Sequence, residues 1–225
     1  MEDLHKKAFS GLIFFIISLG TLLFIPAWTF NYWQAWVFLG VFSTSVLAIT
    51  LYLMKKDPEL LARRMNAGSR AEKEKIQKRI QSLSSIAFIL LFLLSALDHR
   101  FKWSSLPLYL TIGGDILVGL GLLVIFFVFK ENSFTSAIIK IHPDQKVIST
   151  GPYALVRHPM YMGALVMILG LPLALDSLWG LLTIIPFILL MAWRLLEEEK
   201  FLVKNLPGYS GYKNKVKYHL VPFIW

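Results

Sequence analysis

The sequence predicts an all-α, polytopic integral membrane protein with about six membrane spans, and two observations carry this prediction. Of the 225 residues, 56% are hydrophobic and only 16% are charged, against ~25% charged residues in a typical soluble domain. Apolar runs recur along the whole chain, and a helix needs about 20 apolar residues to cross ~30 Å of hydrocarbon. The composition therefore excludes a soluble globular enzyme, a disordered chain and a simple coiled coil.

Six apolar runs are candidates for spans, and three of them are short. The fifth and sixth runs contain Pro172 and Pro186, which we expect to kink these helices rather than break them. The connection between these two runs, Asp176 and Ser177, is tight, so the pair should form a short antiparallel helical hairpin. The six runs are residues 8–27, 33–54, 83–97, 107–129, 160–175 and 178–196.

The distribution of basic residues predicts the orientation of the spans. The chain carries a formal charge of +9, and its Lys and Arg residues gather in segments 55–81 and 130–159 and in the tail after the sixth run. The alternate connections are nearly free of them. Because cytoplasmic loops carry the excess of Lys and Arg, we expect both termini to be cytoplasmic. Segment 57–81 fits either a helix along the membrane surface or a solvated loop.

The polar motifs divide the chain into a membrane-spanning N-terminal part, residues 1–129, and a C-terminal part with the chemistry, residues 130–225. In the C-terminal part, proline disfavours a helix at the residue before it, so His158 should be extended, and Pro159 should open the fifth span. Arg157 and His158 would then lie at a helix N-terminus, where backbone N–H groups favour anionic groups. This first motif reads Gly151-Pro152-Tyr153-Ala154-Leu155-Val156-Arg157-His158-Pro159-Met160-Tyr161-Met162-Gly163.

A second polar motif, Arg194 followed by Glu197–Glu199, ends the sixth span, and the predicted hairpin brings it back beside the first. Taken singly, these residues are typical of snorkelling anchors and solvated faces. Together, at one membrane edge, they indicate a site for a charged, polar cofactor. Arg194 and Glu198, four residues apart, share one helix face. Asp115, an acid inside the fourth span, is a further candidate whose role, functional or structural, stays open.

Several other chemistries find no support in the sequence. The chain has no Cys, so it offers no disulfide and no thiolate. Its five histidines, His142 among them, are scattered and show no zinc-binding pattern, so we expect no metal. No phosphate-binding glycine loop is present, and nothing beyond positive charge favours nucleic acid.

The first motif, with Arg194, Glu198-Glu199 and the later Leu206-Pro207-Gly208-Tyr209 and Tyr212, resembles the isoprenylcysteine carboxyl methyltransferase family. More broadly it is similar to the membrane methyltransferases that include phospholipid N-methyltransferases. The resemblance covers residues 130–225 and implies S-adenosylmethionine as methyl donor at the cytoplasmic membrane edge. It also implies that the strand-like segment 145–148 lines the cofactor. The cofactor contacts that it implies are Gln145, Lys146, Val147, Ile148, Tyr153, His158, Pro159, Met160, Tyr161 and Glu198.

The resemblance implies that Arg194 binds the substrate carboxylate, and carboxyl O-methylation of a lipidic or prenylated small substrate from the bilayer is the first expectation. Arg194 and Glu199 are the predicted catalytic residues; for an amine acceptor, Glu199 or His158 would serve as base. Three alternatives stay open: a phospholipid or amine N-methyltransferase, an NADPH-dependent sterol or enone reductase, and a non-catalytic membrane protein. The sequence does not specify the methyl acceptor or the oligomeric state.

Overall fold

A computed structural model describes residues 2–72, 74–141 and 144–225, and within these ranges the protein consists of helices and irregular segments without a strand. Lys73 of the basic segment and His142 lie outside the described residues. The elements are α1 (Glu2–Ala27), α2 (Trp33–Lys56), α3 (Pro58–Met65), α4 (Lys75–Phe101), α5 (Leu108–Glu131), η1 (Gly151–Ala154), α6 (Pro159–Ala174), η2 (Trp179–Thr183), α7 (Ile184–Asn205) and α8 (Tyr209–Lys215).

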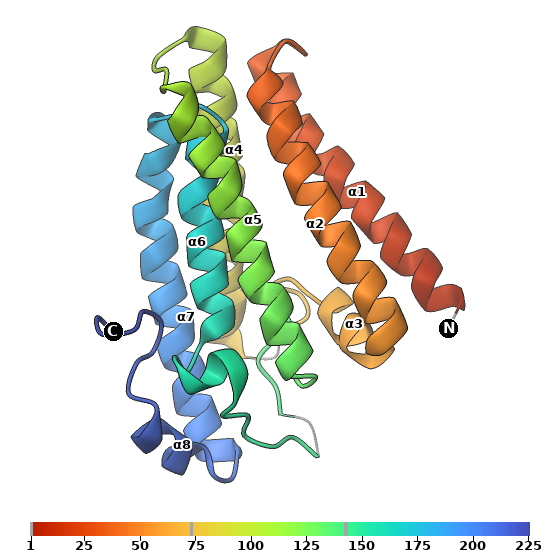
Figure 1. Ribbon diagram of the computed structural model, residues 1–225, viewed down its shortest axis with the longest axis vertical. Coiled ribbons are helices and arrows are strands. Elements are labelled where there is room, and N and C mark those ends of the chain that lie inside the picture. The colour runs from red at the N-terminus through yellow and green to blue at the C-terminus, as the bar shows by residue number, and fades with distance from the viewer. Residues whose placement is uncertain (1, 73, 142–143) are drawn as a thin grey trace.

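Five of these helices, α1, α2, α4, α5 and the continuous η2–α7, are long and apolar enough to cross a membrane, and α6 is a shorter apolar helix. They run alternately up and down, so that the N-terminus, α3, the irregular segment after α5 and α8 lie at the same end of the bundle (Figure 1). The prediction of an all-α, multi-pass membrane protein is confirmed. Which membrane face this end occupies stays a prediction from the loop charges.

The boundaries predicted for the third and sixth spans were wrong. The third span is not short, because α4 begins at Lys75 and extends for 27 residues; its first turns bury Gln77 and Ile80 and expose the basic residues between them. Segment 57–81, for which two structures stayed open, contains the short helix Pro58–Met65 and, from Lys75, the first turns of α4. The hairpin's second helix continues past residue 196 to Asn205. Pro186 consequently lies in the first turn of α7, where proline is tolerated.

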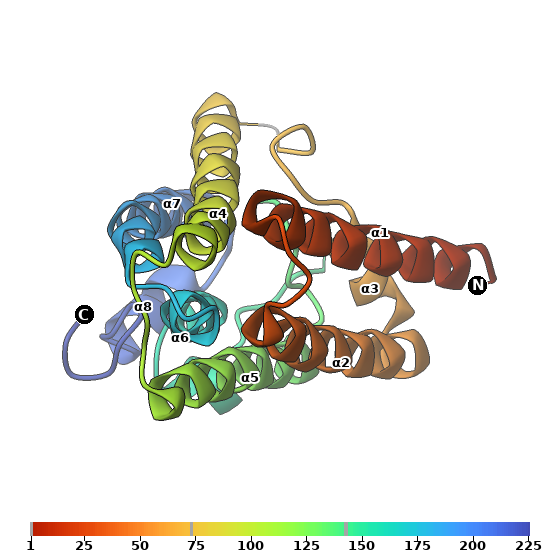
Figure 2. The same ribbon diagram turned by 90° about the horizontal axis from the view of Figure 1, so that it is seen from above.

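The centre of the bundle is α6, which lies among α4, α5 and α7 when the molecule is seen from above (Figure 2). Of its 16 residues only Leu169 is exposed. It packs chiefly on α5, and glycines permit the close approach: a Cβ on Gly121 would lie 2.5 Å from the carbonyl oxygen of Gly163, and one on Gly114 would lie 2.2 Å from the nitrogen of Ala174. Small residues at such a seam let two membrane helices bring their backbones together.

Buried hydrogen bonds fix the turn between α6 and α7 at the end of the bundle away from α8. The carboxylate of Asp98 is fully buried and accepts hydrogen bonds from the hydroxyls of Ser104 and Ser177 at 2.6 and 2.7 Å. The hydroxyl of Tyr32 donates to the carbonyl oxygen of Leu175 at 2.6 Å. These contacts, together with the glycine seam, hold α6 in place, and its N-terminus is where the polar motifs meet.

Candidate functional site

A cleft with about 800 Å³ of empty space, part of it open to solvent, lies at the end of the bundle that carries α8. Its walls come from the irregular segment after α5, the N-terminus of α6, the end of α7, and α8. Segment 145–148, predicted to be strand-like, is irregular. All ten residues predicted from the resemblance as cofactor contacts line this cleft: Gln145, Lys146, Val147, Ile148, Tyr153, His158, Pro159, Met160, Tyr161 and Glu198.

The N-terminus of α6 is tied to the C-terminal tail. Pro159 is the first helical residue, as predicted. The backbone N–H groups of Arg157 and His158 donate to the carbonyl oxygens of Tyr218 and His219, both at 2.9 Å. The Arg157 guanidinium also donates to tail carbonyls, those of residues 216 and 217, at 2.8 and 2.7 Å. The tail therefore braces the chain where it enters the cleft wall.

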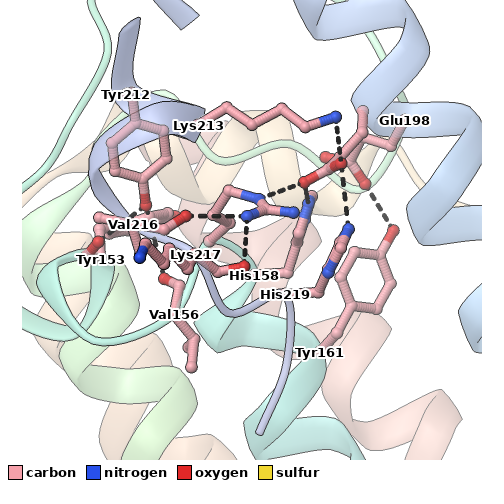
Figure 3. A network of polar contacts seen from close by, with 12 residues as sticks. Tyr153, Val156, His158, Tyr161, Glu198, Tyr212, Lys213, Val216, Lys217 and His219 are labelled. Atoms are coloured by element: carbon pink, nitrogen blue, oxygen red, sulfur yellow. Dashed lines mark hydrogen bonds and ion pairs between the residues drawn. The ribbon is translucent and has the colours of Figure 1, made fainter. Parts of the chain in front are cut away.

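Glu199 is the centre of this bracing and lies outside the cleft lining. Its side chain is 5% exposed; it accepts a hydrogen bond from Arg157 Nε at 2.5 Å and lies 3.3 Å from His158 Nε2. His219 Nε2 and Lys213 Nζ approach its other oxygen at 3.3 and 3.4 Å (Figure 3). The two sequence motifs thus meet, as the hairpin argument predicted. A buried carboxylate is tolerated only with such partners.

A second chain of contacts runs from the cleft to Arg194. Tyr161 Oη donates to Glu198 Oε2 at 2.7 Å and accepts from Arg194 Nε at 3.1 Å. Tyr161 and Glu198 line the cleft, whereas Arg194 does not. Arg194, which the resemblance implies as the substrate-carboxylate ligand, therefore lies beside the cleft and not in its lining. Its guanidinium is paired with an acidic residue, because Arg194 Nη2 lies 2.5 Å from Glu72 Oε1.

Tyrosines form much of the remaining cleft wall. The hydroxyl of Tyr212 donates to the carbonyl oxygen of Tyr153 at 2.7 Å, and the amide of Asn132 donates to the hydroxyl of Tyr153 at 3.0 Å. Burial raises the pKa of both Tyr153 and Tyr209 well above the usual value, so these phenols stay neutral. The hydroxyl of Tyr209 is buried and has no hydrogen-bond partner among the described residues. A ligand in the cleft could supply that partner.

Sequence reasoning missed Glu72, Gln77 and Arg64. Arg64 donates to the carbonyl oxygen of Ser136 at 2.8 Å, and its guanidinium carbon lies 5.1 Å from the ring centroid of Phe129. Burial lowers the pKa of Arg64 from its usual value. Arg64 and Glu72 lie in the basic region between α2 and α4, and Gln77 lies in the first turn of α4. Local charge patterns there indicate topology, and nothing local in the sequence points to partners more than 60 positions away.

The fold and the cleft define the class of the protein: a multi-pass membrane protein with a polar, aromatic cleft at one end of its helix bundle. Comparison with protein families shows one similarity. Residues 109–207, a little under half of the chain, match the family described as phospholipid methyltransferase. Over this range the chain is similar to a family of membrane methyltransferases, in agreement with the resemblance of its sequence motifs. No curated protein sequence matches the chain significantly.

Proposed function

We propose that the protein transfers a methyl group from S-adenosylmethionine to an acceptor delivered by the lipid bilayer. The observation that supports this most directly is the cleft at the membrane edge: it is lined by all ten positions that the resemblance implies for the cofactor. When bound, S-adenosylmethionine supplies an electrophilic methyl group on a sulfonium. In-line displacement at such a carbon requires mainly alignment, which can contribute ~7–11 kcal/mol.

The residues of the cleft fit this donor. Glu198 presents a carboxylate to the cleft, suited to an ammonium group or to ribose hydroxyls, and Tyr161 fixes one of its oxygens by a hydrogen bond of 2.7 Å. The unpartnered hydroxyl of Tyr209 is a buried neutral group that a polar ligand would satisfy. Leaving such a group without a partner costs about 1–3 kcal/mol, so a ligand that satisfies it gains that free energy.

For the acceptor we propose first a carboxylate, as in the isoprenylcysteine-type reaction. A carboxylate is already ionised at neutral pH and needs no base. A guanidinium binds it through two parallel hydrogen bonds, and Arg194 is the guanidinium one hydrogen bond away from the cleft residue Tyr161. The motif resemblance supports the same assignment.

A phospholipid amine is the second candidate, and two observations favour it. The matching family is described as phospholipid methyltransferase, and the charge of Arg194 is already balanced by Glu72. An amine must lose a proton. His158 lines the cleft and could accept it, whereas Glu199 lies outside the cleft among cationic partners. We therefore propose that Glu199 is a positioning residue rather than the base.

Calorimetric titration of the protein in nanodiscs with S-adenosylhomocysteine tests the donor assignment. We expect binding by the wild-type protein and roughly 2- to 10-fold weaker binding by Tyr209→Phe, because one neutral hydrogen bond is lost. Tyr109→Phe is the control, since Tyr109 is 71% exposed in the first turn of α5. Binding of NADPH instead would support the reductase alternative, and binding of neither compound would support a non-catalytic protein.

Transfer of a labelled methyl group distinguishes the acceptors. An S-farnesylated N-acetylcysteine and phosphatidylethanolamine are offered separately with labelled S-adenosylmethionine. Label on the first supports carboxyl O-methylation, and label on the second supports amine N-methylation.

A further inference from the structure

The segment between α3 and α4 places an acidic residue against the candidate acceptor-binding arginine. Glu72 is buried, with 1% of its side chain exposed, whereas the other described residues of this segment are half-buried or exposed. Glu72 Oε1 lies 2.5 Å from Arg194 Nη2, and Glu72 Oε2 accepts a hydrogen bond from the backbone N–H of Ile139 at 3.2 Å. Ile139 lines the cleft. One carboxylate thus holds both Arg194 and a wall of the cleft.

The contacts of Arg194 leave no pair of N–H groups for a second carboxylate. A guanidinium has five N–H groups, and hydrogen bonds already use four of them. Two go to Tyr161 Oη at 3.1 Å and Gln77 Oε1 at 3.3 Å, and two leave Nη2 for Glu72 Oε1 at 2.5 Å and the carbonyl oxygen of Ala137 at 3.3 Å. As long as Glu72 stays in place, no acceptor carboxylate can form two parallel hydrogen bonds with Arg194.

We propose that Glu72 is an internal occupant of the acceptor-carboxylate subsite. It holds Arg194 until the carboxylate of a single-tailed lipid amphiphile takes its place, and so it sets which acceptors are admitted. This inference rests on the proposed carboxylate acceptor. A carboxylate exchanges for a carboxylate with no change in charge at Arg194. A neutral headgroup cannot make this exchange, because it would leave a buried guanidinium without its counter-ion.

The exchange has a consequence for the donor side of the cleft. Arg194 is linked through Tyr161 to Glu198, which we propose as a donor contact. An acceptor that keeps the guanidinium in place leaves this link intact, so donor binding should be nearly independent of which carboxylate occupies the subsite.

The test uses Glu72→Gln in the full-length protein in nanodiscs, titrated with an S-farnesylated N-acetylcysteine and with its carboxamide. The apparent affinity for a ligand is reduced by the fraction of molecules in which its site is closed. Replacing the charged competitor should therefore tighten binding of the carboxylate about 10-fold or more. We expect the carboxamide to be unaffected and S-adenosylhomocysteine to change by no more than about twofold. Glu74→Gln is the matched control, because Glu74 lies in the same segment and is exposed.

Binding of the carboxylate that is unchanged or weakened in Glu72→Gln would overturn the inference and show that Glu72 is a structural ion pair. Failure of the wild-type protein to bind S-adenosylhomocysteine would overturn the proposed function, while the carboxylate titration would still decide the role of Glu72.

If Glu72→Gln does not fold, a cysteine introduced at Ala71 decides the question. The chain has no cysteine of its own, so a maleimide would report this position alone. Saturating carboxylate should speed the labelling, because the segment is released, and the carboxamide should not. An unchanged labelling rate with the carboxylate would contradict the exchange.

Discussion

At the scale of single residues, Glu198 and Glu197 allow the donor site to be tested with matched neighbours. Glu198 lines the cleft, whereas Glu197 pairs with Lys200 on the outer face of α7 at 2.6 Å. Glu198→Gln should weaken binding of S-adenosylhomocysteine roughly 10- to 150-fold, since hydrogen bonds to charged groups contribute ~1.5–3 kcal/mol. Glu197→Gln should leave it unchanged. Calorimetry on both variants makes the measurement, and equal effects would remove Glu198 from the site.

His219 gives a prediction for pH dependence. Burial lowers the pKa of His219 below its usual value of 6.5, the carboxylate of Glu199 opposes this, and the cations Arg157 and Lys213 add to it. A proton therefore binds more readily to the free tail than to the docked tail. Docking should be complete above about pH 6.5 and weaken as the pH falls below it. A spin label at Ile224, which is 81% exposed, should become more mobile in acid.

The control for this pH dependence is His219→Gln, which removes the titrating group. The label should then show a flat response between pH 7.5 and 5.5 if His219 is responsible. A response of unchanged size would assign the effect to another group.

At the scale of elements, the seam between α5 and α6 determines where the cleft wall begins. Gly121→Ala would place a methyl group 2.5 Å from the carbonyl oxygen of Gly163, and overpacking of this kind typically costs ~1–3 kcal/mol. Gly113→Ala, in the same helix, meets nothing within 4 Å and should be neutral or slightly stabilising. Thermal unfolding in detergent compares the two variants. A similar Tm for both variants would show that α5 and α6 can move apart without a loss of stability.

At the scale of the whole molecule, the predicted orientation can be tested with single introduced cysteines, because the chain has no cysteine of its own. Asn66 lies between α3 and α4, and Ser105 lies between α4 and α5. Ser105 is preferable to Ser104, whose hydroxyl donates to Asp98 at 2.6 Å. Single cysteines at Asn66 and Ser105 should react with an impermeant maleimide from opposite sides of the membrane, Asn66 from the cytoplasmic side. Labelling of both from one side would contradict the six crossings.

The features that could be predicted from the sequence depend on residues close together in the chain, and the features that were missed depend on residues far apart in it. The spans and the meeting of Arg157 with Glu199 were predictable, because hydrophobic length and a tight turn dictate them. The first turns of α4 were missed because they are amphipathic, and the charged residues Lys78 and Arg79 interrupt the apolar run that marks a span. The pair between Glu72 and Arg194 joins residues 122 positions apart. Such a contact depends on tertiary packing, and the basic composition around Glu72 gives no sign of it.

Because the central helix α6 is short, we expect the activity of this protein to depend on the thickness of the bilayer. With 16 residues at 1.5 Å each, α6 is about 24 Å long, less than the ~30 Å of hydrocarbon that its longer neighbours cross. We therefore expect its N-terminus, and with it the cleft floor, to be recessed from the plane of the lipid headgroups. A short helix is accommodated by local thinning of the membrane. Thinner bilayers should therefore bring a lipid headgroup to the cleft without lifting its tail from the hydrocarbon, and methyl transfer should slow as acyl chains lengthen.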